Sequence, residues 1–340
     1  MTEFQLGLLL IGVVAIFAVI VFNRVQERSA TKRAERAFGS QHEDVLLAET
    51  PQRKEPTLVE PAVRKTSPEP EASTQALPDE ALDYVIALSP ARSLSAAAFM
   101  EFWTPLEHRF AKRVLAAGRE EAGTWTRIAQ GDPAAYGAFR AALQLVSREG
   151  VVSEGKLIEF RSEVENLAAT LGASSIAPEM KQAMDRAREL DQFCADTDIQ
   201  IVLNLVPAPG SEFPDPRLDA AITATGLERL ADGQHALRDA QGRLLYTVFT
   251  VAGERQGEVA KLAFLLDVPR APEVRRAYES MVRFARQLSA GLGGSLIDDN
   301  GRPLDEQALA AIGAELDSVR QALEGRGLPP GGPLALRLFS

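Results

Sequence analysis

The stretch LLYTVFTVAG, residues 244–253, has the composition of a β-strand whose two faces are both apolar. A half-buried antiparallel strand normally alternates, with apolar side chains directed toward the core and polar side chains toward water. In this stretch Tyr246 and Val248 point to one face, whereas Phe249 and Val251 point to the other. Either the strand is buried on both sides within the chain, or its outer face is apolar because another molecule binds there.

The segments around this strand predict an antiparallel sheet with its helices on one face. Further strands are expected at IQIVLNLVP (199–207) and KLAFLLDVP (261–269), with a turn at Gln241-Gly242. Apolar periodicity and glycine stops predict a short strand over 293–298 and helices over 215–226, 271–293 and 305–323. This order of elements is typical of an α+β fold, with one antiparallel sheet and its helices on a single face.

A similar order of elements is expected upstream, over residues 81–196. LAATLGASSIAPEM, which starts at residue 167, and LSAGLGGSLIDDNG, which starts at 288, both read as a helix end, a glycine stop and a short strand. We therefore predict two tandem copies, a degenerate one over 81–196 and a second over 197–326. Chance similarity between helical segments is the alternative explanation.

The two ends of the chain differ from this globular pattern. LGLLLIGVVAIFAVIVF, residues 6–22, is uncharged and long enough to cross a bilayer, and a basic collar follows it. The positive-inside rule then predicts a single-pass membrane anchor over 1–23, with the N-terminus outside and the following chain cytoplasmic. Residues 24–80 comprise the collar and a proline-rich linker, and residues 327–340 are expected to form a flexible tail.

Composition argues against several classes of function. The chain has one cysteine, three histidines far apart in the sequence and a formal net charge of −10. These features disfavour a disulfide, a metal site and an extended nucleic-acid contact, and we expect no cofactor. The pair Asp298 and Asp299 and the GLGG stretch at 291–294 fit turn chemistry better than catalysis, so we predict no catalytic residue. Trp103 and Trp125 are expected in the core.

Alternation along the three long strands identifies the side chains that face away from the helices. If Leu203, Tyr246 and Phe264 point into the core, the side chains at the alternate positions of each strand lie on the opposite face. The apolar members of that set are Val202, Phe249, Val251 and Leu265, with Gln200, Asn204 and Asp267 around them. A contiguous apolar patch with a polar rim is typical of a binding surface. Coverage of this face by the first copy is the alternative.

The stretches QIVLNLVPAPGSEF, GRLLYTVFTV, FLLDVPRAPEV and LGGSLIDDNGRPLDEQALAAI, together with the anchor and the linker, resemble the bacterial cell-division family ZipA. The resemblance covers the anchor and roughly residues 197–325. It implies an adaptor in the bacterial inner membrane, with its N-terminus periplasmic, that tethers the division ring. Its C-terminal domain would be a split βαβ sheet that holds the C-terminal tail of FtsZ on an open face. The residues it assigns to that groove are Gln200, Val202, Gln234, Phe249, Val251, Ala263 and Leu265.

Three other functions were weighed against this interpretation. An anchored adaptor for a different protein would use the same open face. RNA binding by an open sheet needs several exposed aromatic side chains and a basic signature, and the outward set contains only Phe249. An enzyme would need a constellation of catalytic side chains that the sequence does not provide.

Overall fold

The computed structural model describes residues 76–120, 123–209, 211–214, 218, 221–222, 224–252 and 258–340. The predicted anchor, the basic collar and all but the last few residues of the predicted linker lie outside these ranges. Contacts group residues 69–340 into one compact unit, which contains two antiparallel sheets and their helices. Among the described residues, no helix combines the length and the apolar composition that a membrane crossing requires.

The first sheet is built from five strands in the order β4-β3-β6-β1-β9. Its strands are β1 (Asp83–Pro90), β3 (Val114–Arg119), β4 (Trp125–Arg127), β6 (Ala138–Gln144) and β9 (Ala173–Ile176). Two small ladders flank it: β2 (Leu94–Ser95) with β5 (Ala135–Tyr136), and β7 (Val146–Ser147) with β8 (Gly150–Val151). Every strand pair is antiparallel, as the sequence predicted.

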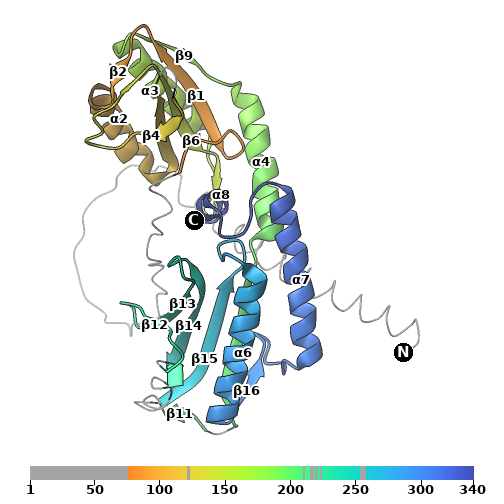
Figure 1. Cartoon of the computed structure of the whole chain (residues 1–340). Helices are drawn as coiled ribbons and strands as arrows, with labels where there is room; N and C mark the ends of the chain where they lie inside the picture. Colours follow the sequence, from red (N-terminus) through yellow and green to blue (C-terminus); the bar gives the residue numbers. More distant parts are fainter. Residues whose placement is uncertain are drawn as a thin grey trace, which may run out of the picture. The chain divides into compact units, whose positions relative to one another are not determined.

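Three long helices accompany the first sheet (Figure 1). They are α2 (Ala96–Phe110), followed by the short 3-10 turn η2 (Ala111–Arg113), α3 (Glu154–Thr170) and α4 (Met180–Thr197). Ser95 and Ser153 cap the first two helices, because each side chain accepts a hydrogen bond from a backbone N–H of the first turn. Trp103 is fully buried, as predicted, and stacks on Phe99, which in turn stacks on Phe139.

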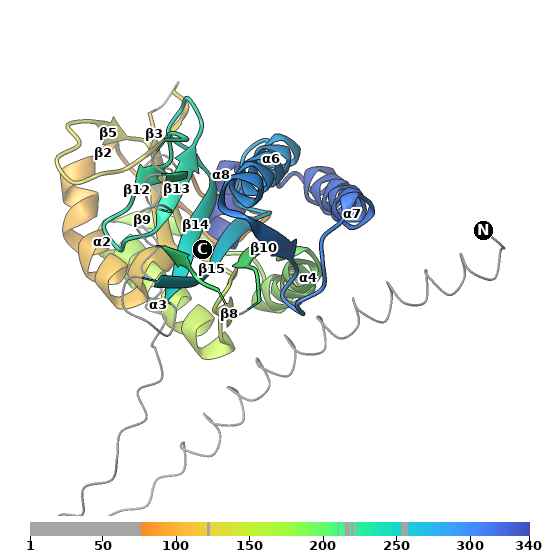
Figure 2. The same ribbon diagram turned by 90° about the horizontal axis from the view of Figure 1, so that it is seen from below.

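The second sheet has the strand order β12-β13-β14-β15-β10-β16, and β11 pairs with β15 beside this path. Its strands are β10 (Gln200–Pro207), β11 (Phe213–Pro214), β12 (Glu228–Arg229), β13 (His235–Arg238), β14 (Leu244–Ala252), β15 (Glu258–Asp267) and β16 (Gly294–Ile297). Helices α6 (Val274–Leu292) and α7 (Glu306–Gly325) pack on each other, and α6 packs on β10, β14 and β15 (Figures 1 and 2). The helix predicted over 215–226 lies partly outside the described residues.

The two sheets share part of their connectivity. The path β6-β1-β9 in the first sheet has the same form as β15-β10-β16 in the second. In each sheet a helix leads into the last of these strands and another helix follows it, α3 and α4 in one case and α6 and α7 in the other. Gly172 and Gly293 end the first helix of each pair with φ values of 64° and 72°, a left-handed conformation that favours glycine.

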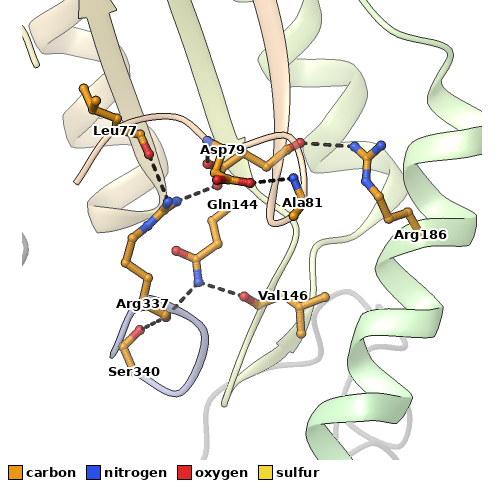
Figure 3. Close-up of polar contacts among 9 residues, drawn as sticks. Leu77, Asp79, Ala81, Gln144, Val146, Arg186, Arg337 and Ser340 are labelled. Atoms are coloured by element: carbon orange, nitrogen blue, oxygen red, sulfur yellow. Dashed lines mark hydrogen bonds and ion pairs between the residues drawn. The ribbon is translucent and has the colours of Figure 1, made fainter. Parts of the chain in front are cut away.

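The predicted flexible tail is wrong for its last residues, because they fold and pack. Helix α8 (Pro333–Leu338) begins with a proline at its first position, where the missing N–H costs nothing. Leu338 and Phe339 are buried in the core, at 1% and 0% exposure. The Gln144 side chain donates to the carbonyl of Arg337 at 2.9 Å, and the Arg337 guanidinium binds the Asp83 carboxylate (Figure 3). Apolar burial and these polar contacts hold the segment against β1 and β6.

A second polar cluster joins the first sheet's region to the second sheet. Arg148, in the turn between β7 and β8, donates to both carboxylate oxygens of Asp267 at 2.7 and 2.8 Å and also to Asp198. Burial alone would lower the pKa of Arg148, but the hydrogen bonds and charges of the two carboxylates raise it above its ordinary value. The predicted boundary at 196/197 therefore falls between elements that share a continuous core and a half-buried ion-pair cluster.

Candidate functional site

The outer face of the second sheet, on the side away from α6, is the candidate site. The strand register places its residues in rows across the sheet. One row joins Thr247 of β14, Leu265 of β15 and Val202 of β10. The next row joins Phe249, Ala263 and Asn204 and continues to Ile297 on β16. Val251 lies opposite Lys261 in a third row. Residues predicted from three separate stretches of sequence are therefore neighbours on one surface, which we call the apolar face.

Burial separates the two faces of this sheet as alternation predicts. The inward side chains Leu203, Tyr246, Val248, Leu262 and Phe264 are between 0% and 2% exposed. Val202, Thr247, Phe249 and Leu265, on the opposite parity, are only half-buried, and Val251 is 36% exposed. The large apolar side chains of these strands thus differ in accessibility according to the face on which they lie. The opening strand is therefore buried on its inner face and accessible on its apolar outer face.

The remaining predicted residues form the floor and the edges of the apolar face. Ala263 is 2% exposed, because its small side chain lies low between its larger neighbours. Gln200 is exposed at the start of β10, and Gln234 is half-buried one residue before β13 begins. Gln234 has the same parity as Ala236, which pairs with Thr247, so it belongs to the same side of the sheet.

Asn204 is a feature of the apolar face whose burial the sequence did not indicate. It was expected at the rim, yet it is 2% exposed and lies beside Ala263. Its Nδ2 donates to Asp299 Oδ1 at 2.9 Å, whereas its Oδ1 is buried without a hydrogen-bond partner among the described residues. An unsatisfied buried acceptor is costly, and because the residue is 2% exposed a bound molecule could reach this oxygen only after the Asn204 side chain rotates.

Asp267 was expected at the polar rim, and the structure gives it a different role. It lies opposite Gln200 at one end of the apolar face, but both of its carboxylate oxygens are bound to Arg148. This partner is 119 residues away in the sequence, so no local pattern could have indicated it. Asp267 therefore offers no free carboxylate oxygen at this end of the apolar face, because Arg148 occupies both.

The apolar face has the chemistry of a docking surface. Among the described residues, no group of three potential metal ligands occurs. A shallow cavity of about 380 Å³ lies on the helical side, lined by Tyr278, Val282, Arg283, Arg286, Glu306 and Leu309. It lies between α6 and α7, away from the apolar face. Apolar side chains around one buried acceptor can hold an extended peptide, but they offer no nucleophile or proton-transfer group.

The fold and this face together define an α+β protein-binding domain, with helices on one side of an antiparallel sheet and an apolar surface on the other. Residues 199–315 match the family model described as "ZipA, C-terminal FtsZ-binding domain". This segment therefore belongs to that family, as the resemblance in the sequence predicted. The assignment supports a cell-division role through FtsZ binding, in a family of protein-binding domains.

The other comparisons with known proteins add little. No curated protein matches the sequence. One solved structure, titled "alkyldihydroxyacetonephosphate synthase in P212121", is 10% identical over 76% of this chain, with a TM-score of 0.18. The chain spans 46% of the length of that protein. A likeness at this level carries no structural or functional conclusion.

Proposed function

We propose that this chain is a membrane-anchored cell-division adaptor. In this proposal the apolar face binds the C-terminal tail of FtsZ, and the N-terminal segment tethers the division ring to the inner membrane. The observation that carries the binding site is the contrast across two neighbouring strands, where Phe264 is fully buried inward and Phe249 is half-buried outward. The family of residues 199–315 supports the choice of FtsZ as the partner.

The apolar face fits a weak, reversible complex. Burying a large apolar side chain contributes about 1.5–3 kcal/mol at most, and four half-buried side chains would each contribute less. Association costs on the order of 4–15 kcal/mol. The largest apolar gain combined with the smallest association cost gives about −8 kcal/mol, so the affinity for a single tail is near micromolar at best. Many anchored copies facing a polymer would bind more tightly through avidity.

Asn204 adds a polar element to this proposal. Its Oδ1 is an unsatisfied acceptor within the apolar face, and an extended peptide presents a backbone N–H at every residue except proline. If the Asn204 side chain rotates so that this buried oxygen reaches the surface, a hydrogen bond from the bound tail would fix the position of the tail along β10. The side chains of Phe249 and Leu265 would then contribute apolar contact on either side.

The anchor and the duplication complete the proposal. Residues 6–22 have the length and composition of a membrane span, and the basic collar supports a cytoplasmic position for the rest of the chain. The shared path β6-β1-β9 and β15-β10-β16 supports residues 81–196 as a diverged copy of the C-terminal domain. A diverged copy is free to present a different outer surface.

The test measures binding of a synthetic FtsZ C-terminal peptide by isothermal titration calorimetry. Phe249→Asp should weaken binding at least about tenfold, because it removes an apolar contact and places a charge on the apolar face. Thr250→Asp is the matched control, because it adds the same charge to the next residue of β14, which is exposed and on the other parity. It should leave the affinity within about twofold.

A stability measurement separates the two faces. Phe249→Asp should hardly change the melting temperature, whereas Phe264→Ala should cost about 3–5 kcal/mol because Phe264 is in the core. If Phe249→Asp unfolds the protein as Phe264→Ala does, Phe249 is a core residue and the proposed site is lost. If neither the native chain nor the control binds the peptide, the face serves another partner.

A further inference from the structure

The outer face of the first sheet has a chemistry different from that of the apolar face. Register joins Arg127, Ala117, Arg140, Ala87 and Ile176 into one row that crosses β4, β3, β6, β1 and β9. Residues that pair directly across antiparallel strands lie on the same side of a sheet. Ala87 is exposed, and Ile176 is 72% exposed at the β9 edge. The row therefore runs from guanidinium groups at one end to an accessible apolar side chain at the other.

Trp125 holds two arginines together beside this row. It was expected in the core, but it is half-buried on the outer face, where it pairs with Arg119. The guanidinium carbons of Arg119 and Arg140 lie 5.0 and 4.4 Å from the centre of its ring. Within the described residues neither arginine forms an ion pair with a carboxylate. In the part of the chain that the structure describes, two like charges are thus stacked on one aromatic ring, and neither is in an ion pair.

The rest of this outer face is already covered by the chain itself. Val85, Leu115 and Ala142 are buried with Ala76, from the segment that precedes β1. In the next row Asp83 is buried against Arg337 of α8. The accessible part of the face is therefore confined to the side chains around Trp125 and the row that ends at Ile176. We call this part the arginine face.

We propose that the arginine face is a second docking surface, which binds an extended acidic peptide segment of a partner protein. Carboxylates of that segment would pair with Arg119 and Arg140, and an apolar side chain would lie on Ala87 and Ile176. Arg140 on β6 and Ile176 on β9 are two strands apart, or roughly 10 Å, which an extended peptide spans in about three residues. The recognised pattern is therefore a carboxylate followed three positions later by an apolar residue.

Charge complementarity favours a peptide over a nucleic acid at this surface. The chain carries a formal net charge of −10, so its overall field opposes a long polyanion. A short acidic segment needs only the local positive charge, and guanidinium groups bind carboxylates in a geometry that suits planar pairs. Trp125 is occupied on the ring by two guanidinium groups, so it is poorly placed to stack on a base.

The experiment uses the full-length chain in a mild non-ionic detergent and a dye-labelled probe peptide, Asp-Glu-Ser-Ser-Leu-Ile, with blocked ends. Binding is followed by fluorescence anisotropy. Arg119→Gln/Arg140→Gln should weaken binding at least about tenfold, because both charge-assisted contacts are lost. The matched control is Arg188→Gln/Arg276→Gln, which removes the same charge from two helices where the side chains are 67% and 82% exposed. It should change the affinity by less than about twofold.

Further probes and variants test which chemical groups the arginine face recognises. The amide analogue Asn-Gln-Ser-Ser-Leu-Ile should not bind, and Phe249→Asp should leave binding of the acidic probe unchanged because it alters the other sheet. Equal weakening by both double variants, or binding of the amide analogue, would overturn the proposal. Stronger binding of a ten-nucleotide polyuridylate than of the peptide would assign the arginine face to RNA. A gain in affinity on Glu69→Gln/Glu71→Gln would assign it to the chain's own acidic residues.

Discussion

Arg337→Met tests the contact that holds α8 against the first sheet. Asp83 is 0% exposed, and the Arg337 side chain that binds it at 2.5 Å is 10% exposed. Burial raises the pKa of Asp83 above its ordinary value, and the charge and hydrogen bond of Arg337 partly oppose this rise. The variant removes the guanidinium but keeps the backbone carbonyl that accepts from Gln144. It therefore removes the ion pair together with the hydrogen bond that the guanidinium donates to the Leu77 carbonyl at 3.3 Å.

Removing one partner of a buried ion pair costs about 3–5 kcal/mol, because the other charge stays buried without compensation. That is a large part of a typical domain stability of about 5–15 kcal/mol. The matched control Arg320→Met breaks the exposed pair with Glu324 on α7 and should cost less than about 1 kcal/mol. Asp83→Asn/Arg337→Met should recover much of the loss, because the amide oxygen still accepts from the Asp79 N–H.

Urea unfolding followed by the fluorescence of buried Trp103 measures these differences. The pH dependence supplies a second check. A carboxyl group whose folded pKa is raised binds its proton more tightly in the folded state, so its stabilising contribution grows as pH falls. The penalty of Arg337→Met should therefore shrink as the pH is lowered from 7 toward the raised pKa of Asp83. A loss below about 1 kcal/mol at pH 7, or a loss that is independent of pH, would refute this account of the contact.

Two further predictions concern the hairpin that leads into β14 and the N-terminal segment. Burial would raise the pKa of Asp239, but hydrogen bonds from Arg243 and Gln241 and the charge of Arg243 lower it below 3.8. The contribution of Asp239 to stability is present above that pH and is lost as the pH falls through the lowered pKa. Asp239→Asn should therefore flatten the acid limb of a plot of melting temperature against pH. An unchanged plot would contradict the role assigned to Asp239. Deletion of residues 1–23 should move the chain from the membrane pellet to the supernatant after cell fractionation, and retention in the pellet would contradict the anchor.

Local patterns were sufficient to predict the second sheet and its two faces. Alternation separated Phe249 from Phe264 because the direction of a side chain in a strand depends only on parity. The glycine stops at Gly172 and Gly293 marked helix ends because few other residues adopt the left-handed conformation found there. The residues of the apolar face could be predicted from three stretches of sequence, because side chains alternate between the two faces in the same way in each antiparallel strand.

Contacts between distant parts of the sequence could not be predicted in the same way. The pairing of Arg148 with Asp267 spans 119 residues, and that of Arg337 with Asp83 spans 254. Each of these charged residues, taken alone, is of a type that is mostly found at the solvent-exposed surface. Helix α8 was missed for a related reason, because a six-residue helix between glycines and prolines has no stable periodicity of its own. The prediction that Trp125 lies in the core was wrong. An aromatic side chain in a short strand indicates burial, unless cations cover its ring.

The contact between Asp83 and Arg337 sets an order for assembly during protein synthesis. At about 5–20 residues per second, the 254 intervening residues take roughly 13–50 s to leave the ribosome. Throughout that interval the nascent first sheet carries an acidic group in β1 whose counter-charge has not yet been translated. Until Arg337 is available, that carboxyl group has to be protonated, hydrated or held by a chaperone.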